Sequence, residues 1–251
     1  MENQSISRKA ALAVIFLTVV SNLQAKSLGS VSTRVLAYFD HLSKEQHLED
    51  YLKLTRPKPV SPEHKKAAIA NLPPNGEMEP SAKGRVKLAA LAPVLESYDR
   101  SGVIEIKVIR DKETTFIGLY ERCALIITEK ALDLLSREEL QAVVAHELAH
   151  ELFWDEYRLA REGGQDDKVQ EIDLRCDGMA IFTLARLGLD PRQLVSAVQR
   201  MTRYSQDTWG ANYYAAPDER VAFVRAMIQL VKNVELAMQA SSRPVAALTS
   251  K

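Results

Sequence analysis

Residues 136–153 read SREELQAVVAHELAHELF and predict the central helix of the fold. Ser136 followed by Glu139 forms a capping box, a common start signal of a helix. The apolar residues behind it recur at helical spacing and form one broad stripe, made of Leu140, Val143, Val144, Leu148, Leu152 and Phe153. A helix with this much apolar surface is expected to pack in the interior.

The same helix carries His146, Glu147 and His150 beside the apolar stripe. Two imidazoles four positions apart lie one above the other on a helix, so both can bind one metal ion. A glutamate next to the first imidazole can then act on a water bound to that ion. The alternative is a surface helix with solvated side chains, but the capping box and the apolar stripe favour a buried helix that faces a cleft.

A third metal ligand has to come from another part of the chain. The protein has five histidines, and none follows His150. Phe153 and Glu156 stand where HExxHxxGxxH sites have their glycine and third histidine, which excludes that class. A site with two histidines is then completed by a carboxylate on a later helix.

Residues 170–187 show helical periodicity and supply that carboxylate. Asp173 and Asp177 are one turn apart and share a face of this helix. Asp173 is the predicted third ligand, and Asp177 can accept the free ring N–H of a ligating histidine. Cys176 could in principle offer a thiolate instead, but the two aspartates explain the pattern better.

The run from Ala124 to Pro191 resembles the M48 metallopeptidases, the family of the CAAX prenyl proteases and the HtpX-like peptidases. In these gluzincins HExxH is followed by a helix that carries ExxAD, and here residues 173–177 read DLRCD. The resemblance covers roughly residues 85–230. It implies an α+β, mostly helical zincin-like fold with a small three- to four-stranded sheet beside the HExxH helix. It further implies one Zn²⁺ on His146, His150 and Asp173, with Glu147 as the base and Asp177 behind the ligands.

The chain departs from the family pattern at three places. Asp173 replaces a glutamate that is one methylene longer, and Cys176 replaces an alanine. The family often has a His-Pro pair before an arginine near the C-terminus, whereas Arg220 is preceded by no histidine there. A developing oxyanion needs a donor besides zinc. The resemblance points to Tyr214 and Arg220 for this role, with Tyr213 as a further candidate.

The N-terminus predicts export. Arg8 and Lys9 precede an apolar run of about eleven residues and a small residue, Ala25, which is the pattern of a signal peptide. The expected division is a signal peptide over 1–25, an N-terminal helical segment and linker over 26–80, and a metallopeptidase domain over 81–251. The mature protein is expected to be periplasmic or secreted without stable membrane insertion, and an uncleaved anchor is the alternative.

Charge and cysteine content restrict the partners. The formal net charge is zero, which gives no electrostatic reason to expect nucleic acid or an anionic membrane as a partner. In an oxidising compartment Cys123 and Cys176 could form one disulfide, but two small buried residues are the preferred interpretation.

Three strands are expected before the zinc helix, over residues 103–110, 114–119 and 124–128. The resemblance favours residues 114–119 as a free edge that binds an extended peptide, and an ordinary sheet strand is the alternative. Residues 154–164 and the acids after them are expected to form the end of the zinc helix and a mobile loop.

Two functions follow from these patterns. The first is a zinc-dependent endopeptidase that hydrolyses peptide bonds of exported or misfolded proteins through a metal-activated water. The second is a catalytically weak zinc-binding module for quality control or protein binding in the cell envelope. The endopeptidase is the preferred interpretation, and the binding module is the alternative.

Overall fold

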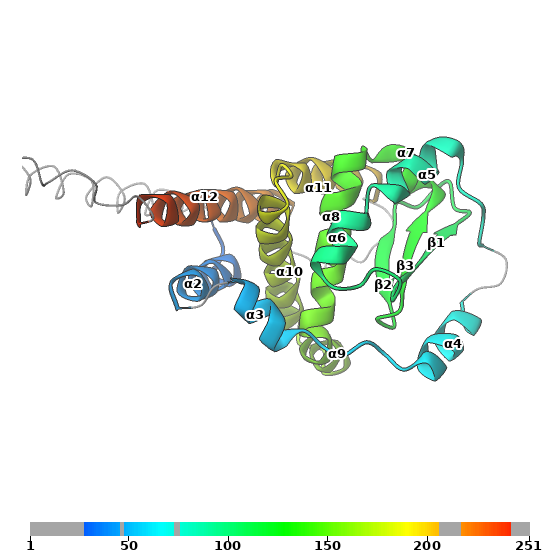
Figure 1. The fold of residues 1–251 in the computed structure, drawn as a ribbon, viewed down its shortest axis with the longest axis horizontal. Helices are drawn as coiled ribbons and strands as arrows, with labels where there is room; N and C mark the ends of the chain where they lie inside the picture. Colours follow the sequence, from blue (N-terminus) through cyan, green and yellow to red (C-terminus); the bar gives the residue numbers. More distant parts are fainter. Residues whose placement is uncertain (1–27, 46–47, 73–75, 206–216, 242–251) are drawn as a thin grey trace, which may run out of the picture.

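The computed structural model describes residues 28–45, 48–72, 76–205 and 217–241. Two packed helices form its centre: α8 (Arg137–Ala149) and α10 (Asp166–Arg186). Helices α2 (Ser30–Glu45) and α12 (Pro217–Ser241) pack on α10, and the sheet lies on the other side of α8 (Figure 1). This is the expected mostly helical α+β architecture.

The remaining helices are short and connect or cover these parts. They are α3 (Leu48–Thr55), α4 (Pro62–Ala70), α5 (Ala82–Ala89), α6 (Ala92–Ser97), α7 (Glu129–Leu134), the 3₁₀ helix η1 (His150–Phe153), α9 (Trp154–Glu162) and α11 (Arg192–Ser205). None of the helices within the described ranges is both long and apolar enough to cross a membrane.

The start of α8 is fixed as the sequence predicts. The Ser136 hydroxyl accepts a hydrogen bond from the Glu139 amide, and Glu139 accepts one from the Ser136 amide, which completes the capping box. The other carboxylate oxygen of Glu139 accepts bonds from Ser196 and Arg200 of α11. One glutamate therefore caps α8 and joins it to α11.

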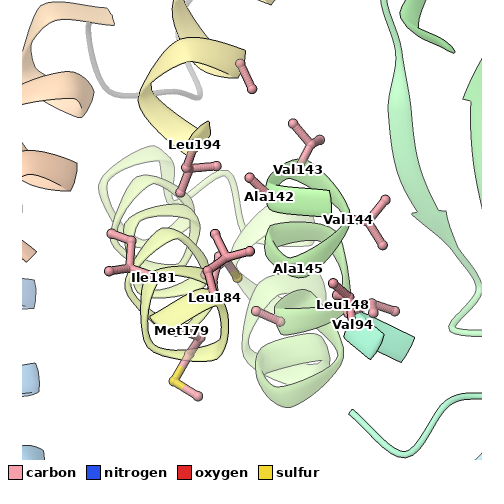
Figure 2. Packing of buried hydrophobic residues seen from close by; sticks show 14 of the residues in the cluster. Val94, Ala142, Val143, Val144, Ala145, Leu148, Met179, Ile181, Leu184 and Leu194 are labelled. Carbon is pink, nitrogen blue, oxygen red and sulfur yellow. The ribbon is translucent and has the colours of Figure 1, made fainter. Parts of the chain in front are cut away.

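The core between α8 and α10 is built of buried apolar side chains, and Figure 2 shows them. Leu184 of α10 points toward α8, whose Ala142 and Ala145 are small, and all three are at most 1% exposed. Small residues let the two helices approach closely. This close approach is what brings the histidines of one helix to the aspartates of the other.

Helix α2 shares this core with the helices that follow it. Phe39 is fully buried, and its ring lies against Gly178 of α10. A Cβ added at Gly178 would lie 2.1 Å from that ring, so only glycine permits this contact. The helical part of residues 26–80 is thus bound to the helix that carries the predicted third ligand.

The sheet has three strands among the described residues, in the order β1 (Glu105–Ile109), β3 (Ala124–Thr128), β2 (Ile117–Tyr120). Strand β1 runs parallel to β3, and β2 runs antiparallel to it. The outer edge of β1 is covered because Met78 donates a hydrogen bond to the Val108 carbonyl. Within the described ranges, the free edge of the sheet belongs to β2.

The region after the HExxH motif differs from the prediction. Residues 154–162 form a separate helix, α9, rather than the end of the zinc helix and a loop, and Asp166 and Asp167 begin α10. The intervening η1 turn, which holds Leu152 and Phe153 of the predicted stripe, separates α9 from α8. Acidic side chains in the first turn of a helix are stabilised by its dipole, which explains the two aspartates better than a solvated loop does.

Candidate metal centre

Three side chains from the centre of the fold converge on one point. His146 lies in the last turn of α8, His150 begins η1, and Asp173 lies in α10. The Nε2 atoms of the histidines are 3.3 Å apart. Asp173 Oδ1 lies 3.4 Å from His146 Nε2 and 3.8 Å from His150 Nε2. These three residues form the group within the described chain that could hold a metal ion.

The spacing fits a tetrahedral ion. Zinc bonds of about 2.0–2.1 Å to nitrogen and oxygen place neighbouring ligands about 3.3–3.4 Å apart. The observed separations of 3.3, 3.4 and 3.8 Å are close to this value. Asp173 Oδ1 is the oxygen directed at both rings, while its buried Oδ2 makes no hydrogen bond with the described residues and lies 3.6 Å from Arg220 Nη1. Asp173 reaches the site although it is shorter than glutamate.

Asp177 supports the first histidine, as the sequence predicts. Its Oδ1 lies 2.8 Å from His146 Nδ1, so this ring nitrogen can donate to the carboxylate and Nε2 is directed at the ligand position. Asp177 is fully buried. The hydrogen bond therefore selects which nitrogen of His146 is available for a metal.

Arg220 lies behind the ligands and is held by the same carboxylates. Its Nε and Nη2 donate to the two oxygens of Asp177 at 2.7 and 2.8 Å. Nη1 lies 3.6 Å from Asp173 Oδ2, and Nη2 lies 3.4 Å from His146 Nδ1. The structure thus places Arg220 in the site with its guanidinium against the aspartates. Its predicted role as an oxyanion donor stays a prediction.

The electrostatics of the two histidines differ. Burial opposes a charge on His146, but Asp177 and Asp173 outweigh it and raise the pKa of His146 to about 10. Burial lowers the pKa of His150 to about 3, and the charge on His146 adds to this effect. Burial opposes the charge on Asp173 as well, yet Arg220 and His146 hold its pKa below the usual value.

Glu147 points to the free edge of the sheet. Its Oε2 accepts a hydrogen bond from the Leu119 amide of β2 at 3.4 Å. Burial raises the pKa of Glu147 to about 7, with His146 acting in the opposite direction. A carboxyl group with this pKa can both take and return a proton near neutral pH.

The remaining predicted residues are only partly placed. Tyr213 and Tyr214 fall outside the described residues. Cys123 and Cys176 are both buried and free, so the preferred interpretation holds and they form no disulfide. Burial raises the pKa of the Cys176 thiol well above its usual value, and Cys176 is not among the three residues that converge on the site.

Sequence reasoning missed one neighbour of the site, Tyr157 of α9. Its ring centroid lies 5.1 Å from that of His150. The two residues are seven positions apart, a spacing of two turns in a continuous helix that would separate them by about 10 Å along the axis. The η1 turn lies between the two residues and brings their rings closer together. No motif in the sequence predicts such a turn.

The mostly helical fold with its small sheet is that of a zincin-like metallopeptidase. The chain belongs to peptidase family M48, whose family model matches residues 87–248, more than half of the chain. No curated protein matches the chain. The family consists of metallopeptidases, and the three converging side chains lie within the matched residues.

Proposed function

We propose that this protein is a zinc-dependent endopeptidase that hydrolyses peptide bonds of exported or misfolded proteins. The observation that carries the proposal is the convergence of His146 Nε2, His150 Nε2 and Asp173 Oδ1 at tetrahedral spacing. Family membership supports the peptidase activity. The signal-like pattern in residues 1–25, which lie outside the described ranges, supports export to the periplasm or the medium.

His146, His150 and Asp173 would hold the zinc, and Asp177 and Arg220 would hold the ligands in turn. Bound zinc would supply a Lewis acid that lowers the pKa of a water molecule toward about 7. Glu147 would take the proton of that water and deliver it to the leaving nitrogen of the peptide. Its pKa of about 7 suits both steps.

The free edge of β2 is the surface that suits an extended substrate. Phe116 accepts a bond from Thr128 of β3, so alternate residues of β2 turn their backbone groups away from β3. Leu119 is one of these, and its amide reaches Glu147. A peptide added along this edge would lie alongside Leu119, whose amide already donates to Glu147, and would pass directly by this proposed base.

The proposal is tested with the purified mature protein, casein as an unfolded substrate and a chelator. We expect about one zinc per chain, lost in Asp173→Ala, and casein cleavage that stops on chelation. Glu147→Gln should keep the zinc and lose roughly 10²- to 10⁴-fold in rate. Glu138→Gln, an exposed change on the same helix, is the matched control and should cleave normally.

Two results would reject this function. Cleavage by Glu147→Gln at the wild-type rate would remove Glu147 from the mechanism. Zinc binding together with casein capture, but without any cleavage by the wild-type protein, would favour the catalytically weak quality-control module instead.

A further inference from the structure

The second histidine of the site lacks the support that the first one has. Nδ1 of His146 bonds Asp177, whereas Nδ1 of His150 is buried without a hydrogen-bond partner among the described residues. Histidines that bind metals almost always donate this N–H to a carboxylate, a carbonyl or a water, which fixes the plane of the ring. Something other than a hydrogen bond within the described chain has to orient His150.

Two rings enclose His150 and can serve that purpose. The His146 ring lies at 5.0 Å with an interplanar angle of 81°. The Tyr157 ring lies at 5.1 Å with an angle of 68°. Both contacts are edge-to-face, the arrangement that aromatic pairs prefer and that contributes about 0.5–1.5 kcal/mol beyond the buried area.

The torsion that turns an imidazole about its Cβ–Cγ bond is broad, so an isolated ring is poorly oriented. Packing on two sides narrows that range. The His146 ring is itself fixed by Asp177. Tyr157 is then the second ring that restricts rotation of the His150 imidazole. Tyr157 is half-buried against the core, and its hydroxyl makes no hydrogen bond to the described part of the chain. Its contribution to the site is therefore the ring.

We propose that Tyr157 is a positioning residue for the metal ligand His150, and that its aromatic ring takes the place of the missing hydrogen bond. This inference rests on the proposed metal site and deepens it. The η1 turn contributes to this arrangement. It begins at His150 and leads into α9, where the Tyr157 ring packs against the imidazole.

The test compares three variants of the full mature protein. Tyr157→Phe keeps the ring, Tyr157→Leu removes it, and Phe153→Leu is the matched control. Phe153 lies in η1, the turn that begins with His150. It is buried, and its ring packs on Arg175. Zinc affinity is measured by competition with a chromophoric chelator, and the ligand geometry is followed by the visible absorption of the Co²⁺-substituted protein.

We expect Tyr157→Phe and Phe153→Leu to bind zinc within about twofold of the wild type and to give its Co²⁺ spectrum. Tyr157→Leu should bind zinc at least tenfold more weakly, the lower end of the about 10- to 100-fold range for loss of a group that orients a ligating histidine. Its Co²⁺ spectrum should be shifted or weakened, a change that a general loss of stability does not produce.

Three results would overturn the inference. Tyr157→Leu could bind zinc like the wild type. Tyr157→Phe could lose as much affinity as Tyr157→Leu, which would assign the effect to the hydroxyl. Phe153→Leu could weaken zinc binding equally, which would assign the loss of affinity to loosening of α9.

If the wild type binds zinc with this pattern of variants but cleaves no casein, the peptidase proposal fails while Tyr157 keeps its role. If the wild type binds no zinc, both fail.

Discussion

His150 and Glu151 are neighbours in sequence, but their side chains enter two buried charged clusters of opposite character. The metal cluster comprises His146, His150, Asp173, Asp177 and Arg220. The second cluster, here named the clamp, comprises Arg100, Arg122 and Glu151. Both lie at the end of α8, so the difference between them reflects their chemistry and not their depth in the protein.

The clamp satisfies nearly all of its polar groups. Arg100 donates from Nε to Glu151 and from its other nitrogens to the carbonyls of Asp99 and Pro57. Arg122 donates from Nη2 to Glu151 and to the carbonyl of Lys58, and its buried Nε has no partner in the described chain. The clamp therefore fastens the linker at residues 57–58 to the end of the central helix.

The metal cluster leaves buried atoms of two ligands, His150 Nδ1 and Asp173 Oδ2, without hydrogen bonds in the described chain. A buried polar group without a partner costs about 1–3 kcal/mol. The comparison shows that the clamp uses its buried charges to join two parts of the protein, whereas the metal cluster directs three potential ligand atoms, His146 Nε2, His150 Nε2 and Asp173 Oδ1, at one point.

The largest expected effect comes from breaking the clamp. Glu151→Ala leaves the guanidinium of Arg100, which is 1% exposed, buried without its counter-charge. We expect a loss of about 3–5 kcal/mol in the free energy of unfolding. Urea unfolding of the zinc-free protein measures it. Glu162→Ala, an exposed ion-pair partner on α9, should cost less than about 1 kcal/mol, and an equal loss in both variants would contradict the distinction.

Zinc should stabilise the protein through the metal cluster alone. At a free concentration of about 1,000 times Kd, a ligand specific for the folded state adds about 4 kcal/mol to the free energy of unfolding. We expect this gain in the wild type and its absence in Asp173→Ala, measured by urea unfolding with and without zinc. Equal stabilisation of both proteins would show that zinc binds elsewhere.

Asp177→Asn should weaken zinc binding by about 10- to 100-fold, because the amide is a poorer acceptor for the His146 N–H than the carboxylate. Chelator competition measures the loss. Asp190→Asn, a substitution at the start of α11 away from the site, is the control and should leave the affinity unchanged. An unaltered affinity in Asp177→Asn would mean that the tautomer of His146 is fixed by another group.

The pH dependence of zinc binding should report one proton. With a pKa of about 10 in the metal-free protein, His146 is protonated at neutral pH, whereas His150 with a pKa of about 3 is not. Zinc must displace the proton of His146 only, so its affinity should fall about tenfold for each pH unit lowered between about pH 8 and pH 6. Calorimetry in two buffers counts the released proton. A release of none or two would contradict these values.

The smallest expected effect is on the free energy of unfolding when the N-terminal cap of α8 is removed. Ser136→Ala removes the cap that Ser136 provides to the Glu139 amide and should cost about 1 kcal/mol. Ser136→Thr retains a capping oxygen and is the control. Because both clusters lie at the other end of the helix, zinc affinity should not change, and a parallel loss of affinity would show that the helix start positions the ligands.

Helical periodicity predicted which side chains of the candidate site share a helix face, while their roles as metal ligands and base stay predictions. The positions of His146, Glu147 and His150 follow from the capping box and the apolar stripe, and the pair Asp173 and Asp177 follows from one-turn spacing. Strand β3 agrees with the predicted residues 124–128, because a short apolar run between turn signals is a local pattern. The free edge predicted near residues 114–119 is also found, as β2.

The partners that join distant parts of the chain could not be predicted. Arg100 and Glu151 are 51 positions apart, and neither belongs to a motif. Tyr157 was missed because the η1 turn interrupts helical periodicity, and the same turn separates α9 from the helix that the sequence predicted to end in this region. The contact of Phe39 with Gly178 depends on how two helices cross, which a single sequence does not encode locally.

One contact at the far end of the chain bears on the order in which the candidate metal centre forms. Glu219, beside Arg220 at the start of α12, accepts hydrogen bonds from Gly29 and Ser32 at the beginning of α2, 190 and 187 positions earlier. A ribosome synthesises residues 29 and 32 long before residue 219. Arg220 reaches Asp177 only when α12 docks on α10, so the arginine side of the candidate metal centre is completed after its two histidines and two aspartates have been synthesised.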